Sequence, residues 1–468
     1  MEADTKKLLE TAPIPRLLCK YSIPTILTLL VNYLYNIVDQ IFVGQGVGIT
    51  GMAATNVAFP LTIVTIAIAL MIGDGCAANL NLCLGRKEQE TADRVISHTV
   101  TLLLGAGVLL GLLGSLFARP IVLLFGATST SFQAALDYTR IIVLGLPFLM
   151  FSSALTSIIR ADGDPKFAMK SMMLGAAINL VLDPVFIFGF HMGVIGAGIA
   201  TVIGEVVAGT LCLSRLKNMK TVRVHRAWLR LTPAVTKQIL RLGFPSFLTQ
   251  IMTAIVQVTM NNLMRTYGAV TPFGSDIALS VYGALMKVYQ IAHAMFVGVS
   301  SATQPINSYN FGARQFKQVK DTYKTASAIA LLVSVVWFAV YQLFPAAIGS
   351  LFVRGDEAYL GACTHIFRLY MLGFFVYGLH MTTASFFQSI GQPLKALALP
   401  FVRQGVILIP LALLLGSRFG LDGALFAVPI ADAASFFLAL LLIKLEFARW
   451  DRKGMTNASA PANSGQSV

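Results

Sequence analysis

The sequence predicts an all-α polytopic membrane protein. Of its 468 residues, 56% are hydrophobic and only 12% are charged, whereas a soluble domain carries about 25% charged residues. Apolar runs of about 20 residues, the length that crosses the hydrocarbon core as a helix, recur along the whole chain. Alternating strands of about ten residues, the pattern of a transmembrane barrel, are absent. Helices are therefore the elements expected to span the membrane.

Twelve such runs divide the chain. We expect spans at 22–43, 52–83, 94–117, 136–160, 167–188, 193–214, 241–264, 276–310, 322–344, 361–388, 394–416 and 420–445. The second and eighth are too long for one bilayer, so they should tilt or project from it. The segment 1–20 lacks the apolar core of a signal peptide. The polar tail at 448–468 is expected to be disordered.

Lysine and arginine set the expected orientation. They collect in alternate loops, which marks those loops as cytoplasmic. The opposite loops hold little more than Arg119, Arg265, Arg354 and Arg418. Both termini should therefore be cytoplasmic. The net charge of +14 is explained by this asymmetry, and we expect no nucleic-acid partner. The basic loops are 6–20, 86–94, 160–170, 215–241, 314–324 and 444–453.

The chain also repeats itself. Four motifs recur in the same order at an offset of about 221–228 residues, and each half would hold six helices in the same orientation. This predicts a parallel repeat, with an N-lobe at 21–214, a cytoplasmic linker at 215–240 and a C-lobe at 241–447, and a substrate path between the lobes. The pairs are "YSIP" and "LGFP", "LCLGRKEQ" and "YNFGARQF", "RADGDPKFA" and "QSIGQPLKA", and "MGVIGAGIATVIGE" and "FGLDGALFAVPIAD".

Two carboxylates lie inside apolar spans of the first half. Asp39 occurs in "YNIVDQIFVG" and Asp183 in "NLVLDPVFIFG", and a charge at the bilayer centre costs about 2.5–3.5 kcal/mol even on insertion scales. Asn179 precedes Asp183 by four residues and so shares its helix face. Pro184 removes a backbone donor and disfavours a helical Asp183. Such a distorted helix can hold a proton or cation; the alternative is a kinked helix whose Asp bonds a neighbour.

Other buried polar residues carry less information. Glu205 and Asp432 occupy equivalent positions in the two halves, which favours a shared packing or hydrogen-bonding role. Lys287 and Arg403 also lie within spans, and we expect Arg403 to pair with Asp432 because an unpaired cation is costly there. The methionines of the seventh and eighth spans are either core residues or, like Met260 and Met286, candidates to line a path for varied ligands.

The motifs of common enzymes are missing. We find no HExxH, no phosphate loop with GK[ST] and no G-x-S-x-G elbow. The five cysteines form no CxxC pair, so we expect neither a structural metal nor a disulfide framework. No cofactor is expected. Without an ATP-binding domain, any pumping must use an ion gradient.

Four segments taken together resemble a known family. "NIVDQIFVG", "NLVLDPVFIFG", "GAGIAT" and "TQPINSYNFGA", on twelve spans in two halves, resemble the MATE (multidrug and toxic compound extrusion) transporters, closest to their DinF/MepA-like prokaryotic branch. The resemblance covers about residues 15–447. It implies a V-shaped pair of lobes in a bacterial inner membrane. It also implies a monomer that exports cationic amphipathic compounds by alternating access, in exchange for H⁺ or Na⁺.

The resemblance also implies roles for particular residues. The family's coupling positions, which would take a proton or Na⁺, fall on Asp39, Asn179, Asp183 and Thr201. Candidates to line the substrate path are Tyr35, Asn36, Gln257, Met260 and Met286. The seventh-span acid of other branches is not evident, since Gln257 lies near that place.

Two other functions stay open from the residues. The first is a flippase or exporter of a lipid-linked or other metabolite in the same superfamily. Such proteins usually have fourteen spans and often a cationic cavity, whereas this chain has twelve predicted spans and buried acids. A non-transporting scaffold or receptor would explain neither the repeat nor the acids. Efflux of an organic cation from vesicles separates all three.

The orientation can be tested by labelling. After the native cysteines are removed, Asn218→Cys should resist an impermeant thiol reagent in intact cells because the linker is cytoplasmic. Ser129→Cys, in an opposite loop, should react. The reverse pattern would contradict the twelve-span topology.

Overall fold

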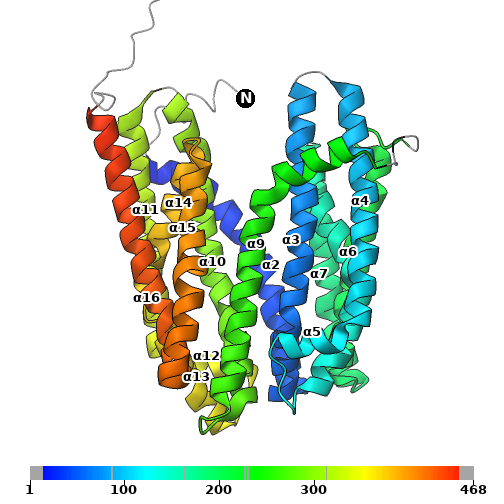
Figure 1. Cartoon of the computed structure of the whole chain (residues 1–468), viewed down its shortest axis with the longest axis vertical. Coiled ribbons are helices and arrows are strands. Elements are labelled where there is room, and N and C mark those ends of the chain that lie inside the picture. Colours follow the sequence, from blue (N-terminus) through cyan, green and yellow to red (C-terminus); the bar gives the residue numbers. More distant parts are fainter. Residues whose placement is uncertain are drawn as a thin grey trace, which may run out of the picture. The chain divides into compact units, whose positions relative to one another are not determined.

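The computed structural model describes residues 14–85, 88–162, 164–225, 228, 231–312 and 314–452. Within these ranges the chain is helical and contains no strand (Figure 1). Its first half holds α2 (Ile14–Gly46), α3 (Ile49–Gly85), α4 (Gln89–Leu116), α5 (Ala118–Leu124), α6 (Phe132–Ala161), α7 (Pro165–Pro184), η1 (Val185–Gly189), α8 (Gly193–Arg215) and η2 (Leu216–Asn218). Then follow α9 (Pro233–Gly268), α10 (Gly274–Gly312), α11 (Phe316–Leu343), α12 (Pro345–Phe352), α13 (Glu357–Tyr370), η4 (Phe374–Val376), α14 (Tyr377–Ser389), α15 (Pro393–Phe401), η5 (Val402–Leu408) and α16 (Ile409–Arg452).

The predicted spans fall on these helices, which confirms the all-α polytopic fold. Within the described ranges, eight helical runs are long and apolar enough to cross a membrane, or nine if the pair α13 and α14, bent by 46°, is one span. The run Leu394–Arg452 counts once there, although it contains two predicted spans that meet at the non-helical Gly420. The second and eighth predicted spans lie on α3 and α10, whose 37 and 39 residues exceed the roughly 20 that a bilayer needs.

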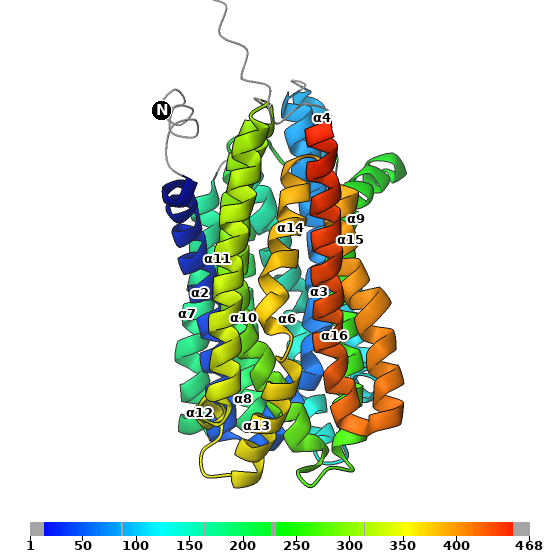
Figure 2. The same cartoon turned by 90° about the vertical axis from the view of Figure 1, so that its left-hand side faces the viewer.

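Contacts sort the chain into two compact units. The first unit comprises Tyr35–Leu285 and Ala346–Cys363, and the second comprises Met1–Leu34, Met286–Pro345 and Thr364–Val468. In the first, α3 packs against both α6 and α9. In the second, α14 packs against α11, α15 and α16 (Figure 2). The lobes expected from the repeat divide the chain differently, and they stay a prediction.

Each unit has an apolar interior and an apolar exterior. The first unit buries Ile72, Leu155 and Ile158 in its core. Yet α4 exposes Leu104, Leu109 and Leu112, each by more than half of its surface. A run of exposed leucines of this kind marks a surface that is not meant for water. It is the pattern of a helix that is packed on one side and faces lipid on the other.

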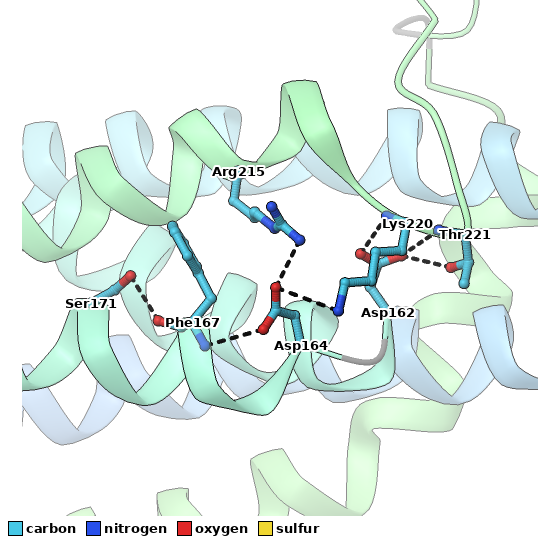
Figure 3. Close-up of polar contacts among 7 residues, drawn as sticks. All are labelled: Asp162, Asp164, Phe167, Ser171, Arg215, Lys220 and Thr221. Carbon is cyan, nitrogen blue, oxygen red and sulfur yellow. Dashed lines mark hydrogen bonds and ion pairs between the residues drawn. The ribbon is translucent and has the colours of Figure 1, made fainter.

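The linker lies against the first unit. Asp162, after α6, is only 2% exposed, and its carboxylate accepts bonds of 2.7 Å from the backbone N–H groups of Lys220 and Thr221 and from the Thr221 hydroxyl (Figure 3). Asp164 accepts from Arg215 at 2.7 Å and pairs with Lys220 at 3.6 Å. Hydrogen bonds to an ionised carboxylate are the strong ones, so these two acids hold the start of the linker.

The hydrogen bonds that hold the linker, which we call the linker clamp, continue along the chain. Asp93 of α4 accepts the Arg223 N–H at 2.8 Å, and the Ser97 hydroxyl accepts the His225 N–H at 3.0 Å. Between these contacts, Val222 is buried with the core of the first unit. The linker was also expected to run to residue 240, whereas α9 begins at Pro233. Proline at the first helical position is a start signal, and it places the helix boundary ahead of the apolar run.

Removal of the Asp162 carboxylate should release the linker. In Asp162→Ala, three hydrogen bonds to a buried carboxylate are lost, and each such bond contributes about 1.5–3 kcal/mol. We expect faster trypsin cleavage after Lys220 and Arg223 in membranes, together with a lower melting temperature.

Thr221→Val is the matched control because it removes only one of the three bonds, so its effect should be clearly smaller. Equal cleavage in Asp162→Ala and the unaltered protein would show that the hydrogen bonds to Asp162 do not hold the linker.

Candidate functional site

Two acids from different helices meet in the first unit. Asp39 lies on α2 and Asp183 lies near the end of α7, and the two carboxyl groups are close enough to interact electrostatically. Asp183 is fully buried. No ion pair to Asp183 occurs within the described part of the chain, and its closest polar neighbours are Asn179 and Asp39. The structure thus brings together the two acids that the sequence placed 144 residues apart.

Asn179 and Thr201 complete the group. The Asn179 amide donates to Asp183 Oδ1 at 3.3 Å and to the Thr201 hydroxyl at 3.4 Å. Thr201 in turn donates to the Ala197 carbonyl at 3.0 Å. The close approach of α7 and α8 makes this possible, because a Cβ at Gly204 would lie 2.7 Å from the Gly175 carbonyl oxygen. All four residues expected to couple transport to an ion therefore lie in one cluster.

The backbone at Asp183 differs from the expectation. Helix α7 continues through Asp183 to Pro184, and Pro184 itself has helical dihedral angles (φ −64°, ψ −32°). The distortion comes afterwards, in the π-helical turn η1. A π-helical turn accommodates an extra residue per turn, which lets the helix absorb the proline without displacing Asp183. The irregular backbone therefore lies next to the acid, on its C-terminal side.

Tyr138 belongs to the site, although the sequence did not single it out. This residue of α6 lies close to Thr201 and within electrostatic range of Asp39, Asp183 and Glu205. A tyrosine in an apolar span is ordinary in a sequence, because packing alone accounts for it. Only the juxtaposition of α6, α7 and α8 shows that its hydroxyl faces three acids.

Glu205 is a third acid near this cluster. Its Oε2 atom is buried and has no hydrogen-bond partner in the described part of the chain. A Cβ at Gly145 would lie 2.5 Å from that oxygen, so α6 packs directly on the carboxyl group. A buried polar group without a partner costs about 1–3 kcal/mol, and more when it is charged. Glu205 is therefore an uncompensated group and not a satisfied packing contact.

Asp432, the equivalent acid of the second half, forms an ion pair. Arg403 Nε donates to Asp432 Oδ1 at 2.7 Å, and both residues are at least 91% buried. The Arg403 guanidinium also lies 5.0 Å from the centre of the Tyr377 ring, and Tyr377 shares a hydroxyl hydrogen bond with Tyr289. The expected pairing of Arg403 with Asp432 is confirmed. Within the described residues, Asp432 has a cationic partner and Glu205 has none, and the packing or hydrogen-bonding role expected for both stays a prediction.

The candidates for the substrate path are differently placed. Gln257 and Met260 of α9 are 5% and 1% exposed, and Gln257 donates to Asn56 at 3.1 Å. Met286 is partly buried on α10, as is Lys287, which was expected only as a buried polar residue. The side chains of Tyr35 and Asn36 lie outside the described residues. A role for any of these side chains in binding stays a prediction.

The site contains oxygen ligands but no transition-metal set. Among the described residues, no three His, Cys, Asp or Glu side chains are grouped as a metal site. The two carboxyl groups and the Thr201 hydroxyl are hard donors, the type that suits small hard cations. Two neighbouring carboxylates repel each other when both are ionised. A proton or a cation between them relieves that repulsion, so the group can alternate between loaded and unloaded states.

Comparison with known proteins agrees with this geometry. The family model MatE matches residues 24–185 and again residues 245–414, so the two matches start 221 residues apart, as the repeat does. The multidrug export protein MepA of Staphylococcus haemolyticus is 26% identical over 437 residues, covering 93% of this chain and 94% of its own.

Solved structures are similar over nearly the full length. A multidrug resistance MATE family transporter in its inward-facing conformation has a TM-score of 0.80 at 25% identity, covering 91% of this chain and 96% of its own. The MATE multidrug transporter DinF-BH has a TM-score of 0.74 at 33% identity, covering 96% of this chain and 98% of its own.

The Arg403–Asp432 pair makes a specific stability prediction. Arg403→Met leaves Asp432 buried without its partner, which should lower the free energy of unfolding by about 3–5 kcal/mol. Arg403→Met combined with Asp432→Leu removes both charges and should recover most of the loss. Melting curves of the single and double variants in detergent measure this. A double variant no more stable than the single one would rule out the ion pair as the cause.

Proposed function

The chain belongs to the MatE family of transporters, and from that premise we propose that it is a multidrug exporter of organic cations, driven by H⁺ or Na⁺ antiport. It is a membrane transporter and not an enzyme. Asp39 and Asp183 are the coupling carboxylates in this proposal, with Asn179, Thr201 and Tyr138 positioning them. The chain acts as a monomer in a bacterial cell membrane, with both termini in the cytoplasm.

The observation that carries the proposal is the contact between Asp39 and Asp183. Ionisable residues inside a membrane are costly and usually mark an ion or substrate path. Here, unlike at Arg403 and Asp432, the neighbours of Asp183 are an amide and a second acid. A permanently ion-paired acid cannot gain or lose a charge cheaply. Asp183 has no ion pair within the described part of the chain, so a proton or cation can bind there and reduce the repulsion from Asp39.

Coupling follows from this change of charge. Loading a proton or Na⁺ from outside makes the charge of the pair less negative by one, and release inside restores it. Each elementary charge that moves inward through 100 mV supplies about 2.3 kcal/mol. When one ion exchanges for one monovalent cation this electrical work cancels, and the concentration gradient of the ion drives export. The Asn179 amide donates to Asp183 and to Thr201, and these bonds hold the carboxyl group in position for either ion.

Asp39→Asn and Asp183→Asn should each abolish gradient-driven export while leaving the protein folded. Asparagine keeps the size and one acceptor oxygen but cannot ionise. The measurement is uptake of ethidium, a fluorescent organic cation, by proteoliposomes under an imposed pH or Na⁺ gradient, with a melting curve of each variant. Only the gradient of the true coupling ion should drive transport.

Asp422→Asn is the control, because Asp422 is an exposed acid paired with His365 and should retain export. Export at the unaltered level by Asp39→Asn or Asp183→Asn would assign that residue a structural role, and Glu205 would become the next coupling candidate.

A further inference from the structure

A group of polar contacts joins the two halves of the sequence at the end of the first unit opposite the linker. The first half contributes α5 and the loop that leads to α6. The second half contributes the C-terminal turn of α9 and the N-terminal turn of α10. All of these residues lie within one compact unit. The ion-coupling acids are not part of this group.

Asp276, at the start of α10, forms the outermost contacts. Its two carboxylate oxygens accept hydrogen bonds from the hydroxyls of Thr128 and Thr130. Thr128 is itself held in place, because Thr128 N–H donates to the Ser131 hydroxyl at 3.1 Å and Ser131 N–H donates to the Thr128 hydroxyl at 3.0 Å. This reciprocal turn points both threonine hydroxyls of the first half toward one carboxylate of the second.

A second row of contacts lies beside it. Arg265 Nη1 donates to the carbonyls of Leu123 and Ala127 at 3.2 and 3.4 Å, and Asn262 Nδ2 donates to the Leu124 carbonyl at 2.7 Å. Carbonyls at the end of a helix have no partner within the helix. A cation near them is favourable because it complements the helix dipole. Side chains of α9 therefore satisfy the end of α5.

The backbones also meet at this end. Gly126 has φ +104°, and a Cβ there would lie 3.0 Å from the Asn261 carbonyl carbon. Below this contact, Asn261 and Gln257 of α9 form buried amide hydrogen bonds with Asn56 of α3, at 3.0 and 3.1 Å. The polar contacts at this end therefore lie beside a buried layer in which α9, from the second half, packs closely on α3 of the first half.

We propose that Asp276, Arg265 and Asn262 form a latch that closes the transport path at this face and opens once in each cycle. The inference rests on the proposed function, since a path between two repeat halves can open at a face only if contacts between the halves at that face break. Partly exposed hydrogen bonds suit this task. Water can replace each one, so the net gain per bond is small, and the latch can bias the closed state without trapping it.

Asp276→Ala should favour the open state. Loss of hydrogen bonds to one carboxylate shifts such an equilibrium by about two- to tenfold per bond. The reporter is Met260→Cys, which replaces a side chain only 1% exposed in the closed layer, in a protein whose five native cysteines have been replaced. In nanodiscs a thiol reagent can reach both faces of the membrane. There, Asp276→Ala should increase the rate at which this cysteine reacts by about two- to tenfold for each of the two bonds lost.

Asp137→Ala is the control. Asp137 is an acid at the same end, but its hydrogen bonds go to Gln133 of the same helix. It should leave the reaction rate unchanged. An unchanged rate in Asp276→Ala, or an equal increase in Asp137→Ala, overturns the latch. This readout does not require transport, so it stands apart from any failure of the proposed function.

A cross-link tests the cycle itself. In the cysteine-free background, Thr130→Cys combined with Asp276→Cys should stop ethidium transport when oxidised, and a reductant should restore it. The control pair Gln133→Cys with Asp137→Cys lies within the first half and should permit transport in both states. Continued transport by the fully cross-linked latch pair overturns the proposal. If the cysteine-free protein itself fails to transport ethidium under any gradient, the proposed function fails, and the labelling result still decides the latch.

Discussion

The central constraint on this structure is the cost of ionised carboxyl groups inside apolar helices. Asp39 and Asp183 face each other, and α6, α7 and α8 surround them with an amide and two hydroxyls that are neutral. Two ionised acids side by side in apolar surroundings are costly because they repel each other and are poorly hydrated. The group is therefore more stable when a proton or a cation is bound to it.

The two halves of the sequence solve the same problem in different ways. In both, a proline is followed by a π-helical turn: Pro184 precedes η1, and Pro400 precedes η5. In the first half Asp183 stands before the proline, and no cation pairs with it in the described part of the chain. In the second half Arg403 stands after the proline and pairs with Asp432. The repeat thus keeps the proline and the π-helical turn, while the charges beside them differ between the two halves.

Polar contacts secure both ends of the first unit. At one end, Asp162 and Asp93 accept hydrogen bonds from the backbone N–H groups of Lys220, Thr221 and Arg223 in the linker. At the other end, Asp276 and Arg265 bind the loop before α6. Between these ends, apolar contacts with little directional preference are joined by the amide hydrogen bonds of Asn56 with Gln257 and Asn261, which link α3 to α9. The polar contacts at both ends and in this layer therefore fix the register in which α9 lies on the rest of the unit.

The sequence by itself determined the class of protein, the spans and the principal acids. Composition and 20-residue apolar runs reflect the solvent that the chain must face, and this requirement is local to each segment. Asp39, Asn179 and Asp183 could be identified because a polar residue in an apolar run is conspicuous wherever it occurs. Arg403 and Asp432 could be paired because each is too costly to leave alone.

The tertiary structure decided everything that depends on which helix faces which. Tyr138 could not be predicted, because a tyrosine in an apolar span carries no sign of the acids opposite it. Glu205 and Asp432 look alike in the repeat, and only their neighbours distinguish an uncompensated acid from an ion pair. The bonds from Asp162 to backbone N–H groups were equally hidden, because every residue except proline offers such a donor. Contacts of this kind depend on the packing of helices distant in sequence, which no periodicity within one helix encodes.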